Sequence, residues 1–161
     1  MNEDFMNFLI DFIKYSFEQD ANFSNINFEV SEAFDYNNKL SCPQIAIQVL
    51  DDSENERYTS FEAENVSNFG IQLNVFAENM EIAGKVYTAR EACVKIIGKL
   101  KQFMIDLKFK RINTNILRLV RTGTDYTNPY DNSGQIYVSV LRYNSQIVYP
   151  YNISLENLKG D

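Results

Sequence analysis

The clearest pattern of apolar and polar residues lies between residues 69 and 143. Residues 69–77 alternate strictly, and their apolar side is formed by Phe69, Ile71, Leu73, Val75 and Ala77. This alternation predicts a β-strand with one covered face. Residues 82–108 carry an apolar stripe at helical spacing, which predicts one long central helix. Two further apolar segments, 111–121 and 136–143, predict two more strands.

The amino-terminal part predicts one helix and two strands. Residues 1–20 predict an amphipathic helix whose apolar face holds Phe5, Phe8, Leu9, Phe12, Ile13 and Phe17. Residues 26–30 and 44–50 alternate and predict two strands. Residues 51–68 are acidic and poor in apolar side chains, and we interpret them as a hairpin arm between antiparallel strands. Residues 150–161 are predicted to be a short tail.

These elements predict an α+β fold in a single domain over residues 1–161. We expect a small mixed or antiparallel sheet of about five strands, with the N-terminal helix and the long central helix packed on it. A chain of 161 residues can bury about two-thirds of its unfolded surface. A hydrophobic content of 45% with 23% charged residues is ordinary for such a domain.

The last two predicted strands carry apolar residues on both sides. In segment 111–121, each side mixes apolar residues with an arginine. In segment 136–143, we expect one side to face the core and the other, with Tyr137, Leu141 and Tyr143, to face outward. A strand open to water should not have such an outer side. The pattern therefore predicts that the outer face is covered, either by a neighbouring subunit or by the N-terminal helix.

The sequence offers little material for catalysis or metal binding. It contains no histidine, which removes the commonest general base and the commonest metal ligand. Cys42 and Cys93 are interpreted as two buried reduced thiols. Asp125, Asp131 and Asn132 lack the spacing of a calcium loop and favour a turn instead. We therefore predict a protein that is not an enzyme, with no catalytic residue, no cofactor and no metal site.

Charge is strongly segregated along the chain, although the net charge is only −7. Residues 1–84 hold 3 basic and 16 acidic side chains, a net charge of −13, whereas residues 85–121 hold 10 basic and 2 acidic, a net charge of +8. The basic segment has three interpretations: a solvated helix face with ion pairs, a subunit interface with the acidic half, or a nucleic-acid surface. The overall negative charge disfavours the last.

The start of the chain is acidic where a secretory signal would be basic, and no apolar run reaches the roughly 18 residues that span a membrane. We expect synthesis in the cytoplasm and no membrane partner.

The order of these elements resembles that of the tail terminator, or tail completion, proteins of long-tailed phages and phage-tail-like particles. The resemblance covers roughly residues 1–145 and is carried by four segments: Pro43–Ile45, Gly70–Ala77, Phe109–Ile112 and Gln135–Tyr143. These are strand patterns rather than invariant signatures.

The resemblance implies a ring, usually of six copies, that caps the tail tube and ends its elongation. Such a ring also provides the surface for the head connector and, in contractile tails, meets the sheath. The implied partners are the chain itself, the tail tube protein, the sheath and the head connector, within a virion or tail-like particle. No catalytic residue is implied. A related head–tail joining protein and a nucleic-acid-binding accessory module remain alternatives.

Charge segregation and mixed strand faces together suggest where copies would meet. We predict contacts between carboxylates of the arm and basic residues 95–121 of a neighbour, with two tyrosines of the last strand. The predicted interface residues are Glu62, Glu64, Lys95, Lys99, Arg111, Arg118, Arg121, Tyr137 and Tyr143.

Overall fold

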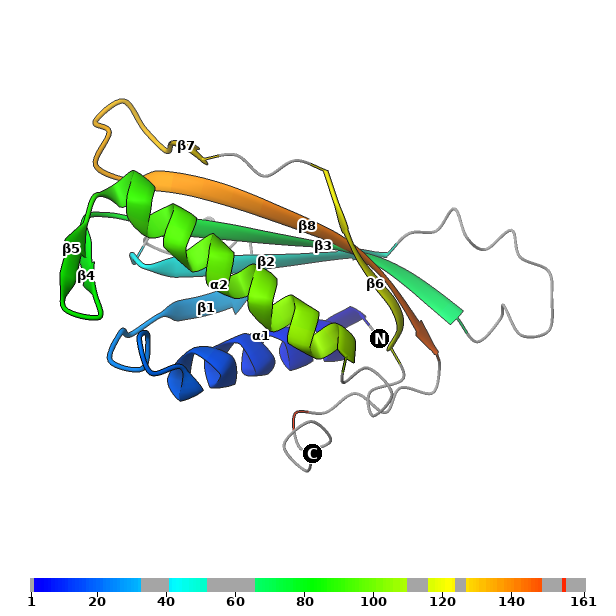
Figure 1. The fold of residues 1–161 in the computed structure, drawn as a ribbon. Helices are drawn as coiled ribbons and strands as arrows, with labels where there is room; N and C mark the ends of the chain where they lie inside the picture. The colour runs from blue at the N-terminus through cyan, green and yellow to red at the C-terminus, as the bar shows by residue number, and fades with distance from the viewer. Residues whose placement is uncertain are drawn as a thin grey trace.

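A computed structural model describes most of the chain and shows an α+β fold (Figure 1). The described residues are 2–32, 41–51, 66–109, 116–123, 127–148 and 155. Most of the predicted acidic arm and of the tail, together with Glu62, Glu64 and Arg111, therefore lies outside the described residues.

The described part contains two long helices and eight strands. The helices are α1 (Asn2–Gln19) and α2 (Ala89–Phe109). The strands are β1 (Glu29–Glu32), β2 (Gln44–Asp51), β3 (Val66–Ala77), β4 (Met80–Ile82), β5 (Lys85–Tyr87), β6 (Ile116–Thr122), β7 (Thr127–Pro129) and β8 (Tyr137–Val148).

Six of these strands form one sheet in the order β1-β2-β3-β8-β6, with β7 also paired to β8. β1 and β2 are parallel, and every other pair in this sheet is antiparallel. β6 pairs with the second half of β8 and β7 with its beginning, so they follow one another along the same side of β8. The α+β prediction with a mixed sheet is confirmed, with six strands in place of about five.

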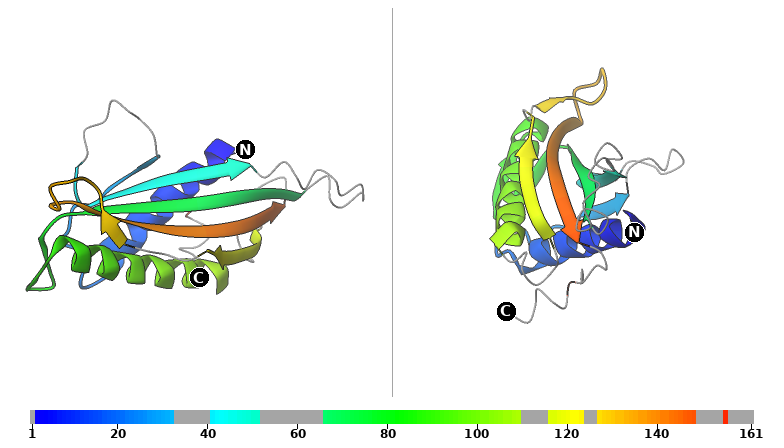
Figure 2. Two further views of the ribbon diagram at one scale, coloured as in Figure 1. Left: turned by 90° about the horizontal axis from the view of Figure 1, so that it is seen from above. Right: turned by 90° about the vertical axis from the view of Figure 1, so that its right-hand side faces the viewer.

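Both helices pack on one face of this sheet and share a single hydrophobic core (Figure 2). The ring of Phe5 on α1 lies 5.2 Å from that of Phe69 on β3, and the ring of Phe17 lies 4.9 Å from that of Phe103 on α2. The apolar face predicted for residues 1–20 is therefore a core face. We expected the outer face of the sheet to be covered either by a neighbouring subunit or by the N-terminal helix. The structure excludes the second, because α1 packs on the same face as α2.

The prediction of which side of the last strand faces inward is wrong. Leu141 and Tyr143 are buried against the helices, whereas Val138 and Val140 lie half-buried on the opposite face. The pairing of β3 with β8 decides this, because Leu73 lies opposite Leu141 and registered partners point to the same face. Both sides of β8 carry apolar residues, so alternation alone could not choose between them.

The expected sides of β6 also differ from those in the structure, because the strand has a register shift between Ile116 and Arg118. We expected Ile116 and Arg118 on one side and Leu119 on the other. The extra residue at the shift brings Ile116 and Leu119 both into the core and leaves Arg118 exposed.

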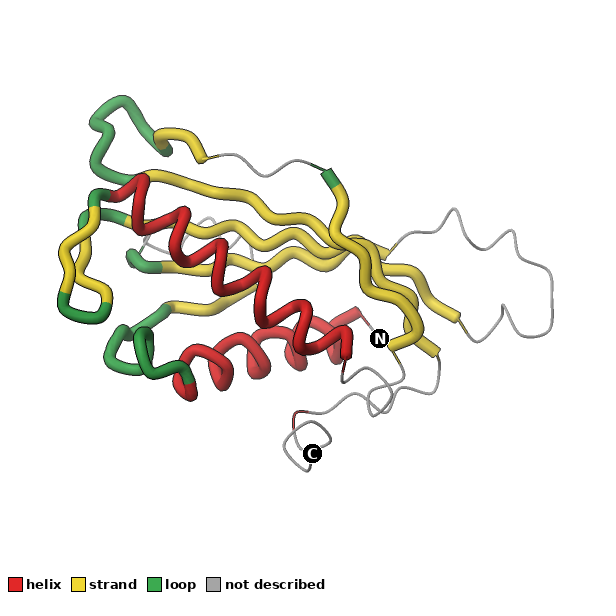
Figure 3. The backbone as a smooth tube through the Cα atoms, in the orientation of Figure 1, coloured by secondary structure: helices red, strands yellow, loops and turns green. Residues whose placement is uncertain are grey.

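The central helix begins later than predicted, because residues 80–87 form a separate hairpin of β4 and β5 (Figure 3). Its two-residue turn is Ala83–Gly84, with φ angles of 52° and 82°. Two consecutive positive φ angles are those of a type I′ hairpin turn. The helix then starts with a capping box, in which Glu91 N–H donates to Thr88 Oγ1 (3.3 Å) and Thr88 N–H donates to Glu91 Oε2 (3.2 Å).

No helix in the described residues is long and apolar enough to cross a membrane.

Candidate functional site

The face of the sheet opposite the helices is the strongest candidate for a functional surface, and we call it the open face. None of the described helices packs on it, because both belong to the core on the other side (Figure 2). Strand register places the following residues on it: Gln44, Ala46, Gln48 and Leu50 from β2; Asn68, Gly70, Gln72, Asn74 and Phe76 from β3; Val138, Val140, Arg142, Asn144 and Gln146 from β8; and Arg118, Val120 and Thr122 from β6.

A hydrogen-bonded chain of side chains orders the middle of the open face. Gln72 Nε2 donates to Asn74 Oδ1 (2.9 Å), and Asn74 Nδ2 donates to the carbonyl of Ala46 (3.2 Å). Arg142 Nε donates to Gln72 Oε1 (3.2 Å). Asn74 is only 9% exposed, so this chain fixes its amide in place. The result is a preorganised polar centre spanning three adjacent strands.

Apolar side chains surround this polar centre. Leu50 is 55% exposed, and Val120 and Val140 are half-buried. At one end, the ring of Tyr130 packs edge-on against the ring of Phe76, with centroids 5.2 Å apart. Apolar side chains around fixed polar groups are typical of surfaces that bind another protein. The sequence showed the polar side of residues 44–50 and 68–76, but not that the last strand adds valines to the same face.

The predicted interface residues on α2 lie on the helix side of the molecule, away from the open face. Lys99 Nζ lies 2.6 Å from Asp20 Oδ2 and bonds Gln102 Oε1 (3.3 Å), so it is engaged within its own chain. Burial alone would raise the pKa of Asp20, but the Lys99 ammonium and the backbone N–H groups of Asn22 and Phe23 outweigh it and lower this pKa. Lys95 is exposed, with Nζ 5.5 Å from the ring centroid of Tyr87.

The predicted interface residues on the last strands are also divided between faces. Arg118 is exposed on the open face, whereas Arg121 lies opposite Tyr143 on the helix side. Tyr143 is 6% exposed and belongs to the core, which corrects its predicted outward position. Tyr137 is half-buried, and its carbonyl accepts a hydrogen bond from Cys93 Sγ (3.2 Å). The structure therefore brings these residues onto several surfaces rather than one.

Both cysteines are free thiols, and Cys93 is buried while Cys42 is half-buried. Burial raises the pKa of each thiol to about 11. The thiolate is the reactive form of cysteine, so neither side chain is a ready nucleophile at neutral pH.

The carboxylate of Asp131 has a turn-forming role. Asp131 Oδ1 accepts hydrogen bonds from the backbone N–H of Ser133 (3.1 Å) and from its hydroxyl (2.6 Å). This agrees with the prediction of a turn, while Asp125 lies outside the described residues. Within the described part of the chain, no three Cys, Asp or Glu side chains gather as metal ligands.

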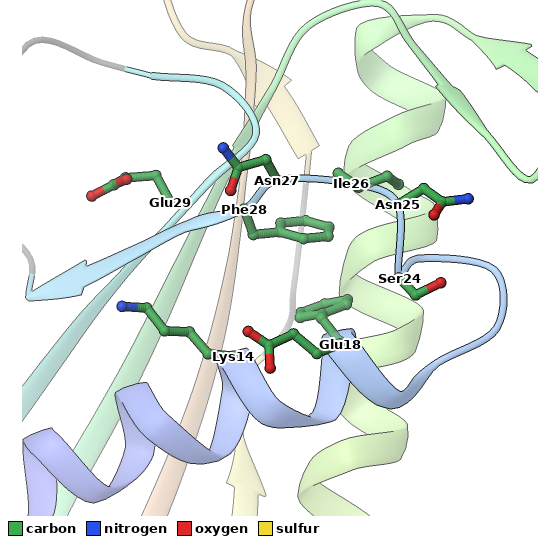
Figure 4. A pocket seen from close by; sticks show the side chains of 9 residues that line it. Lys14, Glu18, Ser24, Asn25, Ile26, Asn27, Phe28 and Glu29 are labelled. Atoms are coloured by element: carbon green, nitrogen blue, oxygen red, sulfur yellow. The ribbon is translucent and has the colours of Figure 1, made fainter.

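A surface hollow of about 470 Å³ lies between α1 and the segment that leads into β1 (Figure 4). Lys14 and Glu18 border it from the helix, and residues 24–29 border it from the other side. The rings of Phe17 and Phe28 stack in its wall with centroids 4.2 Å apart. Its rim is polar and its carboxylates belong to the exposed surface, so it lacks the convergent groups of an active site.

No family model matches the chain, and no curated protein matches it either.

Proposed function

We propose that this chain is a tail terminator of a long-tailed phage or a phage-tail-like particle. In this role, a ring of copies, six in the usual arrangement, caps the tail tube and ends its growth. The ring then offers a surface to the head connector and, in a contractile tail, to the sheath. The observation that carries the proposal is the open face, an ordered and partly apolar sheet face that no described helix covers.

The segments behind the family resemblance support this proposal by their position. Pro43–Ile45 leads into β2, Gly70–Ala77 lies in β3 and most of Gln135–Tyr143 lies in β8. These three strands are neighbours at the centre of the sheet. Three of the four segments thus belong to one continuous piece of structure, and most of the fourth, Phe109–Ile112, lies outside the described residues. The β4–β5 hairpin is an addition that the sequence pattern did not predict.

The chemistry of the open face suits binding of a protein rather than catalysis. Its ordered groups are amides, one arginine and a backbone carbonyl, which offer hydrogen-bond donors and acceptors to a polar partner. We therefore assign no catalytic residue, cofactor or metal to the chain. Synthesis in the cytoplasm followed by assembly into the particle fits the same role.

A nucleic-acid accessory role has weaker support. The basic residues of α2 lie on the helix side of the sheet, and the two arginines of β6 are divided between the faces, with Arg118 on the open face and Arg121 on the helix side. These residues therefore do not all form one stripe that could follow a phosphate backbone. The net charge of −7 also opposes such binding.

The test mixes the purified chain with tail tubes assembled from the tube protein encoded in the same gene cluster. Negative-stain imaging should show a ring at one tube end and tubes that no longer lengthen. A chain that remains monomeric and never engages tube ends would contradict the proposal. Binding to head connectors alone would indicate a head–tail joining protein, and strongly salt-dependent binding to DNA would indicate the nucleic-acid role.

A further inference from the structure

We propose that copies of this chain join edge to edge, with β6 of one copy pairing with β1 of the next. The sheet would then continue from one copy into its neighbour. The pairing of the strands is inferred from the two edges of the sheet alone. Only the closure of the paired copies into a ring rests on the proposed function.

Among the described elements, each of the two outer strands of the sheet pairs with a neighbouring strand along one edge only. β1 pairs only with β2, and β6 pairs only with β8. The outer backbone groups of an edge strand are a template for pairing with another chain. Charged side chains on an edge strand usually prevent such pairing, because like charges repel. An edge that carries the opposite charge is not repelled, so the signs of the charges decide which two edges can pair.

The two edges carry opposite charges. β1 holds Glu29 and Glu32, and β6 holds Arg118 and Arg121, and all four side chains are exposed. Two β1 edges would bring carboxylates together, and two β6 edges would bring guanidinium groups together, so each edge is repelled by its own kind. Only contact between β6 and β1 brings the opposite charges together.

The charges also match face by face. Glu29 lies opposite Gln44 in the β1–β2 pair, which places it on the open face with Arg118. Glu32 lies opposite the buried Ile47, which places it on the helix side with Arg121. Copies that keep the same face outward therefore place a carboxylate and an arginine together on each face.

Strand direction favours the same arrangement. β1 and β2 are parallel, and three antiparallel steps lead from β2 to β6, so β6 runs opposite to β1. A copy placed beside the first with the same face outward thus offers its β1 antiparallel to β6. Antiparallel pairing is the more stable form and continues the alternation already present in most of the sheet.

Glu29, at the start of β1, borders the hollow of Figure 4, and Lys14 and Glu18 of α1 form the opposite wall. A neighbouring strand that pairs at the start of β1 would therefore also lie near these two side chains. A head-to-tail contact of this kind uses a different surface on each copy, and it closes into a ring when the rotation between copies permits.

Reversal of the edge charges tests the pairing. In Arg118→Glu and Glu29→Arg, self-association measured by sedimentation should weaken by about tenfold or more, because each variant places like charges together. The chain that carries both changes should associate within about threefold of the native one. Arg90→Glu, at an exposed position of α2, is the matched control and should associate as the native chain does. Single variants that associate normally, or a double variant as weak as the singles, would overturn the proposal.

Disulfide trapping gives a second test, which shows whether side chains of β6 and β1 on the same face of the sheet lie next to each other. In a parent with both native cysteines replaced, a chain with Arg118→Cys is mixed with one carrying Glu29→Cys or Ser31→Cys, and oxidised with and without tail tubes. Registered cross-strand positions are close enough for a disulfide. Linked pairs are expected in these mixtures, and far fewer with Glu32→Cys, whose side chain points to the other face. No linked pair in any mixture contradicts the pairing.

The two proposals can fail separately. Tubes capped by rings whose cysteines never link would overturn the edge pairing and leave the terminator role standing. Linked copies that never engage a tube end would support the pairing and contradict the terminator role. A native chain that stays monomeric at about millimolar concentration and forms no ring on tubes would overturn the pairing as well.

Discussion

The two faces of the sheet are built from neighbouring residues of the same strands, yet only one of them packs against the described helices. On the helix side, β1, β2, β3, β6 and β8 contribute apolar side chains to one core with α1 and α2. On the open face, amides and an arginine form a hydrogen-bonded chain with exposed or half-buried apolar residues around it. One face therefore stabilises the fold, and no described helix covers the other, which we propose as the assembly surface.

The largest expected effect contrasts two adjacent residues of β3. Leu73 is fully buried on the helix side, so Leu73→Ala should lower the free energy of unfolding by about 3 kcal/mol through lost burial and a cavity. Urea unfolding followed by circular dichroism measures this change. Gln72→Ala, on the open face, should cost about 1 kcal/mol. Equal losses would remove the distinction between the faces.

The next effect concerns Asn74, the most buried polar residue of the open face. Asn74→Ala removes the hydrogen bonds that its amide makes with Gln72 Nε2 and with the carbonyl of Ala46, and should cost about 1–2 kcal/mol in the same unfolding experiment. Asn144→Ala is the control, because Asn144 is exposed on the same face. If Asn74→Ala lowers the free energy of unfolding no more than the control does, the hydrogen-bonded side chains do not order the open face.

A smaller effect is expected at the start of α2. Thr88→Ala removes the hydroxyl that accepts from the N–H of Glu91, and should cost about 1 kcal/mol in unfolding free energy. Thr88→Ser keeps a hydroxyl and should recover most of it. Because the cap belongs to the helix side, assembly of the folded variant should be unchanged; impaired assembly would link α2 to the contact surface.

The smallest effect compares a basic residue from each side. Lys99→Gln should cost about 0.5 kcal/mol at pH 7, because it removes the partly exposed ion pair with Asp20. The folded pKa of Asp20 lies below its ordinary 3.8, so this contribution is present above about pH 4 and is lost as the pH falls through the folded pKa. Unfolding at pH 7 and about pH 3 should show the difference between variant and native shrinking. Arg118→Gln should leave stability unchanged, and a stability loss there would assign Arg118 to the fold instead.

Much of the helix side could be predicted from the sequence. The apolar stripe of residues 5–17 and the alternation of residues 69–77 each mark one face only, so they indicate which side is buried. The capping box at Thr88 and Glu91 and the turn at Ala83–Gly84 are also local signals, although the apolar spacing of residues 82–108 concealed them.

The open face could not be predicted to the same extent, because it depends on register. β8 is apolar on both sides, and only its pairing with β3 shows that Leu141 turns inward and Val140 outward. On β6, the register shift after Ile116 separates arginines that simple alternation would misplace. The position of β1 at the far edge is a long-range property, so the opposite charges of the two edges became visible only in the structure.

The most direct test of the open face as the assembly surface compares two exposed apolar residues. Leu50 on the open face is 55% exposed and Ile105 on α2 is 53% exposed, so neither Leu50→Glu nor Ile105→Glu should unfold the chain. Each folded variant is added to growing tail tubes, and tube length and end rings are scored by negative-stain imaging. We expect Ile105→Glu to cap tubes as the native chain does and Leu50→Glu to leave them uncapped. Normal capping by Leu50→Glu, or loss of capping by Ile105→Glu alone, would contradict the open face as the assembly surface.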